Sequence, residues 1–296
     1  MEGEPTYAGG VSEELPAAAE SAGTWGSTLS CQELAAVTGV GFAPVGQVFG
    51  AAVYAAGSST ANCPGASASS AGMASGGDPG GFEAVIQAMY QARHAAIDRM
   101  TAECAALGGH GVVGVQLPRR LFSLGGLEFT AIGTAVRVAG NAGLADPFTS
   151  ALSGQDFARL ITAGWVPVGL ALGIAIGSRH DDLTTIRQGR PWAGNAEVLG
   201  WTELVNQARR DAGRRLAQDV ERLGAEGVVT ADMGMRVRAR DCPATVGRRD
   251  HIVEVTLIGT AIARFSQAHR QPSPALAIMP LGPRRSQPAW ALQGHY

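Results

Sequence analysis

Apolar residues recur at steps of three and four along two stretches of the chain, which is the spacing of one face of an α-helix. Each stretch is followed by a glycine, Gly108 in the first and Gly224 in the second, and glycine is common directly after a helix. The pattern predicts two long helices, over 91–107 and 207–223. The two apolar faces consist of Met89, Ala92, Ala96, Met100, Cys104 and Leu107, and of Val205, Ala208, Ala212, Leu216, Val220 and Leu223.

Apolar segments of strand length lie before and after each predicted helix. The first helix is preceded by FAPVGQVFGAAVY, over 42–54, and the second by WVPVGLALGIAIG, over 165–177. A glycine turn leads from each helix into a valine-containing strand, and LEFTAIGTAV or VEVTLIGTAI forms the last strand. A short helix is expected at 29–37. This order predicts a β-α-β-β unit, one helix lying on an antiparallel sheet, in each half of the chain.

The two series of segments are also similar in sequence. Residues 29–54 align without gaps with 152–177, and 10 of these 26 positions are identical. The long helix and its following turn repeat at an offset of 116 residues, and the last strand repeats at an offset of 126. Length changes confined to connections are expected of homologous domains. We therefore predict domains at 29–140 and 152–266, joined by an exposed linker at 141–151.

The two ends of the chain differ from these domains in composition. Residues 1–28 contain five Glu and no basic residue, whereas 267–296 contain three Arg, several Pro and no acidic residue. Such segments bury little apolar surface, so we expect both tails to be disordered. The segment PLGPRRSQPAW in the second tail is either a docking motif for a protein partner or a remnant of a linker.

One segment of the first domain carries a family resemblance. The sequence ARHAAIDRMTAECAALGGHGVVGVQL, followed by FTAIGTAV, resembles the YbjQ family, whose domain is also described as heavy-metal-binding. The second domain resembles it less, because Thr230 replaces the last glycine of the turn and 233–251 contains an Arg-rich insertion. The resemblance implies two tandem dodecin-subunit-like units of an α+β fold, usually assembled into rings of five. It implies no catalytic residues.

Charge and composition narrow the function classes. The net charge is −2 and the chain contains no lysine, so it offers no broad basic surface for nucleic acid. The longest apolar run, 165–177, is shorter than the ~20 residues of a membrane-spanning helix, and the N-terminus lacks the pattern of a secretory signal. The four cysteines form no CxxC pair, which fits a reducing compartment. We expect a cytoplasmic protein without membrane insertion.

Catalytic motifs are absent from the sequence. It contains no HExxH, no GxSxG, no P-loop and no GxGxxG after a suitable strand. We therefore expect a non-enzymatic protein without a cofactor, namely an oligomeric scaffold or binding module. The alternatives are a heavy-metal-binding protein and a carrier of a small ligand within a ring.

Candidate metal ligands do not repeat between the two domains, because no Cys or His aligns with Cys or His in the other copy. Cys104 and His110, six residues apart across the end of the first helix, are the candidates within the first domain. Cys104 also fits a small core residue, and His110 fits a solvated loop. The cluster HDD at 180–182 is either a cation ligand set or a turn with Asp as a helix cap.

Polar residues repeat on the last strand of each domain. Since side chains alternate along a strand, Glu128, Thr130 and Thr134 should share one face, which meets water, a neighbouring subunit or a ligand. The second domain repeats this face with Glu254, Thr256 and Thr260. Arg93 and Arg209 also repeat, and they either pair with the glutamates or are surface charges with buried stems. The Arg-rich insertion is either a solvated hairpin or a contact for an acidic partner.

Self-association is expected from the sheets themselves. A sheet of three or four strands leaves unpaired edges, and such edges invite pairing with another chain. The resemblance points to rings. Two units per chain allow either stacked rings of five chains or a single ring with an even number of units. We expect stacked rings of five chains, because the two domains differ in loops that would keep their interfaces distinct.

Overall fold

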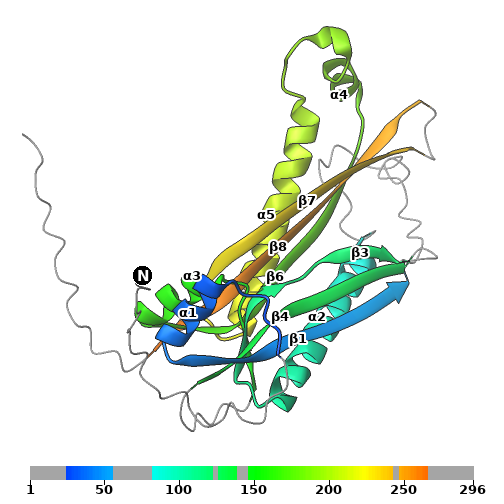
Figure 1. The fold of residues 1–296 in the computed structure, drawn as a ribbon. Helices are drawn as coiled ribbons and strands as arrows, with labels where there is room; N and C mark the ends of the chain where they lie inside the picture. Colours follow the sequence, from blue (N-terminus) through cyan, green and yellow to red (C-terminus); the bar gives the residue numbers. More distant parts are fainter. Residues whose placement is uncertain (1–24, 56–81, 123–125, 139–145, 243–246, 266–296) are drawn as a thin grey trace, which may run out of the picture. The chain divides into compact units, whose positions relative to one another are not determined.

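The computed structural model describes residues 25–55, 82–122, 126–138, 146–242 and 247–265, and these form an α+β fold (Figure 1). The predicted α+β class is confirmed. Most of both predicted tails lies outside the described residues. The described residues as far as Arg264 belong to one compact unit, and no helix among them is long and apolar enough to cross a membrane.

The first sheet is built around β4 (Gly126–Val138). It has the strand order β1 (Phe42–Ala55), β4, β2 (Gly111–Gln116) and β5 (Phe148–Thr149), and the short β3 (Arg119–Phe122) also pairs with β4. All pairings are antiparallel except that of β5 with β2. Helix α2 (Glu83–Ala106) packs on this sheet through its apolar stripe, in which Met100 and Cys104 are fully buried.

The second sheet is built around β8 (Arg249–Arg264). Its order is β6 (Trp165–His180), β8 and β7 (Gly227–Asp241), and both pairings are antiparallel. Helix α5 (Leu199–Arg222) packs along β6 and β8 (Figure 1). The connection between β6 and α5 contains α4 (Leu183–Gln188) and a 3-10 helix (Pro191–Ala193), which the sequence analysis does not predict.

The long helices lie very close to the first strand of their sheets. A Cβ atom added at Gly50 of β1 would lie 2.0 Å from the Ala96 carbonyl oxygen, and one at Gly173 of β6 would lie 2.3 Å from that of Ala212. Only glycine fits where two backbones approach so closely. Helices α2 and α5 each contain 24 residues. Both end one residue before the predicted end, with Leu107 and Leu223 as C-caps, and both begin eight residues before the predicted start.

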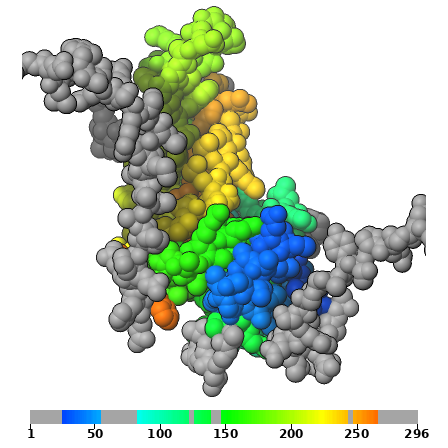
Figure 2. Space-filling model, turned by 60° about the vertical axis from the view of Figure 1, so that its left-hand side comes forward, coloured from blue at the N-terminus to red at the C-terminus, as the bar shows by residue number. Residues whose placement is uncertain are grey.

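Two short helices precede the first strands, near the expected position. Helix α1 (Cys31–Gly39) has a capping box, in which Ser30 and Glu33 bond to each other's backbone N–H groups. Helix α3 (Gly154–Thr162) is capped by Ser153. The two helices lie side by side, blue and green in Figure 2, and the Gly154 N–H donates to Glu33 Oε1 (3.2 Å).

The predicted exposed linker at 141–151 is wrong in its final part. Residues 139–145 lie outside the described residues, but Phe148–Thr149 forms β5 and both Thr149 and Ser150 are buried. The backbone groups of this segment pair with those of β2, so it is part of the first sheet.

Candidate functional site

The contact between the first half (25–138) and the second half (146–265) is the most extensive candidate site among the described residues. The segment before α3 adds a strand to the first sheet. The Ser150 N–H donates to the Val112 carbonyl (2.8 Å), and the Ser150 carbonyl accepts from the Val115 N–H (2.9 Å). Val112 and Val113 are fully buried as a result. This strand addition joins the two halves by backbone hydrogen bonds.

Helix α2 also contacts the second half, at the edge of β6. The Tyr90 hydroxyl donates to the Leu172 carbonyl (3.2 Å) and accepts from the Ile174 N–H (2.9 Å). Leu172 and Ile174 are fully buried, the latter in a cluster with Met89 of α2. One phenol therefore satisfies two backbone groups of an edge strand that would otherwise face solvent. We call this strand addition and helix packing together the internal contact.

Several aligned counterparts of the residues in the internal contact are exposed. Val113 of the internal contact aligns with Val229, which is 36% exposed. Leu172 aligns with Phe49, which is 49% exposed. Ile176, which packs against the cluster of Met89 and Ile174, aligns with Val53, which is also 49% exposed. Each half thus has one covered side and one open side. The open surface formed by β7 and α5 is called the β7 side. The open surface formed by residues 25–29 and β1 is called the β1 side.

Two of the repeated threonines hold the segments that precede the short helices. The Thr134 hydroxyl accepts from the Thr28 N–H (3.0 Å), and the Thr260 hydroxyl accepts from the Ala151 N–H (2.9 Å). Both threonines are fully buried. Their shared position therefore fixes residues 25–29 in one half and the segment ending at Ala151 in the other.

The remaining predicted site residues divide between surface and interface. Thr130 donates to the Pro118 carbonyl (3.3 Å) and Glu128 is partly buried on β4. Arg209 is exposed on α5, as expected of a surface charge. Glu254 pairs with neither repeated arginine but with Arg119, at 2.6 Å between Nη1 and Oε1.

Arg93 is not a surface charge, and it forms no hydrogen bond or ion pair within 4.0 Å with either repeated glutamate, although the charge of Glu254 attracts it. Its side chain is buried at the interface of the two halves, with its guanidinium carbon 4.9 Å from the centre of the Phe129 ring. Burial lowers the pKa of Arg93 to about 10, with Arg119 contributing, so the group stays charged at neutral pH. Arg93 and Thr256 line a cavity of about 220 Å³ together with Arg119, Arg236, Asp232, Glu254 and other residues.

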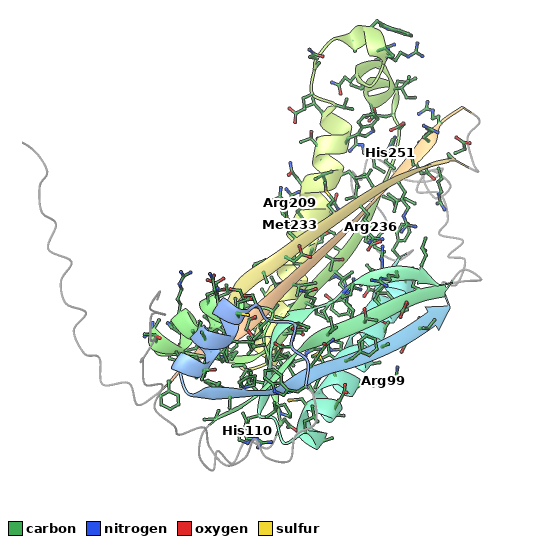
Figure 3. All side chains as sticks on the ribbon, in the orientation of Figure 1. Arg99, His110, Arg209, Met233, Arg236 and His251 are labelled. Atoms are coloured by element: carbon green, nitrogen blue, oxygen red, sulfur yellow. The ribbon has the colours of Figure 1, made fainter. Side chains whose placement is uncertain are left out.

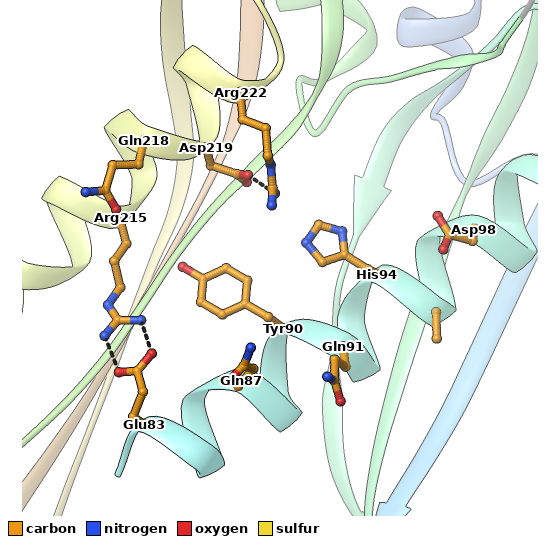
Figure 4. Close-up of a pocket in the computed structure, with 11 residues that line it drawn as sticks. Glu83, Gln87, Tyr90, Gln91, His94, Asp98, Arg215, Gln218, Asp219 and Arg222 are labelled. Atoms are coloured by element: carbon orange, nitrogen blue, oxygen red, sulfur yellow. Dashed lines mark hydrogen bonds and ion pairs between the residues drawn. The ribbon is translucent and has the colours of Figure 1, made fainter. Parts of the chain in front are cut away.

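A more open groove of about 630 Å³ lies between α2 and α5 (Figure 4). Arg215 donates to both carboxylate oxygens of Glu83, at 3.2 and 2.6 Å, and this pairing lowers the pKa of Glu83. Deeper in the groove, Asp219 pairs with Arg222 and accepts from the Leu172 N–H (2.8 Å). These ion pairs tie the two long helices to each other and to β6, and they form no nucleophile and base arrangement.

A cluster of metal-type ligands lies near the end of the β7–β8 hairpin. One ligand atom each of His180, Cys242 and Asp250 lies within 4.8 Å of the others, and Asp250 Oδ1 is 2.9 Å from His180 Nδ1. His180 and Asp250 are register partners on β6 and β8. Arg240 Nε lies 3.4 Å from Asp250 Oδ2. His251, labelled in Figure 3, is not part of this cluster and instead pairs with Asp181, with 3.1 Å between its Nε2 and Asp181 Oδ2.

The sequence predicts this region only in part. It singles out the HDD run, and the second of its alternatives is confirmed for Asp182, which caps α4 by accepting from the Thr185 N–H (2.7 Å). Cys242 and Asp250 are 60 and more residues away from His180, and no spacing rule links them. Only the pairing of β6 with β8 could have brought them together in advance.

Known proteins place the chain in a family. Residues 43–139 match the model of the YbjQ family described as "Putative heavy-metal-binding". The Encapsulin nanocompartment protein Rv1762c of Mycobacterium tuberculosis is 36% identical over 251 residues, which cover 80% of this chain and 85% of that protein. The chain belongs to the same family as Rv1762c. The resemblance to YbjQ is thereby confirmed for the first half, and neither the family description nor the name of Rv1762c contains an enzyme activity.

The YbjQ description makes the candidate metal ligands of the first half worth testing against their surroundings. The Cys104 thiol donates to the Gly111 carbonyl (3.4 Å), and burial raises its pKa to about 11. A metal requires the thiolate, so this environment disfavours Cys104 as a ligand. His110 Nδ1 accepts from the Val138 N–H (3.2 Å). Neither residue belongs to the ligand cluster found among the described residues, so these two residues do not fit a metal site.

Proposed function

We propose that the chain is a non-enzymatic subunit of a homo-oligomer, acting as a scaffold or binding module, and that its halves are two copies of one YbjQ-like unit. The name of Rv1762c, an encapsulin nanocompartment protein, supports a role connected with assembly. The observation that carries the proposal is the internal contact. The first half buries its β2 surface in the internal contact, and the second half exposes the aligned surface on the β7 side. The second half buries its β6 surface there, and the first half exposes the aligned surface on the β1 side. The same contact can therefore form between two chains.

The repeated contact would be head-to-tail. The β7 side of one chain would meet the β1 side of the next, with residues 25–29 of that next chain adding to β7 as the segment before α3 adds to β2. Heterologous contacts of this kind close into rings when the rotation allows it. Because the internal contact sets the two halves side by side, it favours one ring in which halves alternate over two stacked rings. Five chains would form such a ring with ten units, twice the five units per ring that the resemblance implies.

Light scattering on a size-exclusion column tests this proposal. We expect a mass several times the 30.4 kDa of one chain, and five times that mass for a ring of five. A mass of 30.4 kDa at micromolar concentration would contradict self-association. Another multiple would keep the oligomer and rule out the five-chain ring.

Heavy-metal binding is the second candidate function, and the His180–Cys242–Asp250 cluster favours it. Zinc prefers nitrogen, sulfur and carboxylate ligands at about 2.0–2.3 Å, which places the ligand atoms of a tetrahedral site about 3.3–3.8 Å apart. The three ligand atoms lie within 4.8 Å, so movements of about 1 Å would bring them to a zinc ion. Bound zinc would connect the ends of β6, β7 and β8 and leave one position for water.

Cys242→Ser tests this second function. We expect the untagged wild-type protein to hold about one zinc ion per chain and the variant to bind zinc at least about 100-fold more weakly, since it loses a ligand. Elemental analysis and competition with a chelating dye give both quantities. Cys31→Ser is the matched control, because Cys31 is exposed on α1. Zinc retained by Cys242→Ser, or no zinc in the wild type, would contradict this function.

A further inference from the structure

The cavity at Arg93 lies between the halves and is lined by charged residues of four elements. Arg93 comes from α2, Arg119 from β3, Asp232 and Arg236 from β7, and Glu254 from β8. Its volume of about 220 Å³ suits a small ligand rather than a peptide or a nucleotide base with its sugar. Arg236, labelled in Figure 3, lies on β7. We call it the arginine pocket.

Arg93 is the unusual member of the arginine pocket. Its side chain is only 5% exposed, and its Nε and Nη1 atoms find no hydrogen-bond partner among the residues that the structure describes. Buried guanidinium groups are normally paired, because a buried charge without a partner is strongly destabilising. The Phe129 ring covers one face of the guanidinium but accepts little of its hydrogen-bonding capacity. The N–H donors of the Arg93 guanidinium therefore need a hydrogen-bond acceptor.

The carboxylates in the arginine pocket do not meet this need. Glu254 is engaged by Arg119 at 2.6 Å and lies 3.6 Å from Arg238. Asp232 is exposed on β7 and forms no ion pair with any described residue within 4.0 Å. Arg119 Nε is a second buried donor without a partner among the described residues. The lining thus has three cations against two carboxylates, and its donors outnumber its acceptors.

We propose that the arginine pocket binds a phosphate group, free or as a small phosphate monoester, through Arg93, Arg119 and Arg236. Guanidinium groups match the oxygens of phosphate and bind them through two parallel N–H donors. Arg93 and Arg236 form no ion pair with a described carboxylate within 4.0 Å. Their two positive charges match the charge of a phosphate dianion better than that of a singly charged carboxylate ligand. Since all lining residues belong to one chain, this proposal does not depend on self-association.

Isothermal titration of the untagged full-length chain with inorganic phosphate at low ionic strength tests the proposal. We expect about one phosphate per chain, and Arg93→Met should weaken binding at least about tenfold, as expected for the loss of a charged hydrogen bond. The variant should fold, because replacing a buried unpaired charge by an apolar side chain of similar length is often neutral. Arg236→Met, at an exposed position, should weaken binding as well and gives a second measurement if Arg93→Met does not fold.

Arg209→Met is the matched control, since Arg209 aligns with Arg93 but is exposed on α5 and lies outside the pocket. It should bind phosphate as the wild type does. The proposal is overturned by a wild type that does not bind phosphate, by equal losses in Arg93→Met and Arg209→Met, or by binding of acetate in preference to phosphate. A phosphomonoester that binds more tightly than inorganic phosphate would support the proposal and identify the fuller ligand.

Discussion

Gly50→Val should destabilise the protein by at least about 3 kcal/mol, the upper end of the cost of overpacking. A side chain at this position would begin 2.0 Å from the Ala96 carbonyl oxygen and 2.7 Å from the Met100 nitrogen. Both are backbone atoms of α2, so no side-chain rotation relieves the clash and the helix must move away from β1. That movement would open the core in which Met100 and Cys104 are fully buried. Thermal unfolding followed by circular dichroism measures the loss.

Gly39→Val is the matched control for this prediction. No atom lies within 4 Å of a Cβ at Gly39, at the end of α1, so the same substitution should change stability by less than about 1 kcal/mol. Gly173→Val should repeat the effect of Gly50→Val in the second sheet, where the added atom would lie 2.3 Å from the Ala212 carbonyl oxygen. Equal melting temperatures for Gly50→Val and Gly39→Val would contradict the close packing of α2 on β1.

Phe49→Glu and Val229→Glu should each convert the oligomer into single chains. Phe49 lies on the β1 side and Val229 on the β7 side, and their counterparts Leu172 and Val113 are fully buried in the internal contact. A carboxylate at either position would be buried without a partner in the repeated contact, which weakens association by more than about 100-fold. Light scattering measures the mass of each variant at the same concentration as the wild type.

Leu183→Glu is the control for both variants. Leu183 is an exposed apolar residue of α4, and α4 has no counterpart among the described residues of the first half. This variant should keep the wild-type mass. If Leu183→Glu dissociates as readily as the other two, general loss of surface hydrophobicity rather than the β1 and β7 sides explains the effect.

The sequence is sufficient to predict the parts of the fold that depend on local patterns. The apolar steps from Met89 to Leu107 specify a helix with one buried face, and the structure places Met89, Met100 and Cys104 in that face. The alternation in LEFTAIGTAV likewise specifies which residues of β4 meet α2. These features follow from periodicity alone, so a single amino-acid sequence is enough to predict them.

The candidate sites depend on contacts that no periodicity encodes. Arg93 and Arg209 occupy aligned positions, yet one is buried and the other exposed, because the face of α2 that carries Arg93 packs against the other half and the corresponding face of α5 does not. The same asymmetry makes Phe148–Thr149 a strand where the sequence predicts an exposed linker. Aligned positions carry similar residues in both halves, whereas the burial of each position depends on the neighbours that its half has. Long-range strand pairing, as between His180 and Asp250, is hidden for the same reason.

Mixing Phe49→Glu with Val229→Glu tests the head-to-tail contact most directly. Each variant alone lacks one of the two complementary sides, whereas the intact β7 side of Phe49→Glu can still bind the intact β1 side of Val229→Glu. Light scattering of the equimolar mixture should therefore give a mass of twice 30.4 kDa, with each variant alone at 30.4 kDa. A mixture that stays at 30.4 kDa, or a single variant that still assembles on its own, would contradict the account.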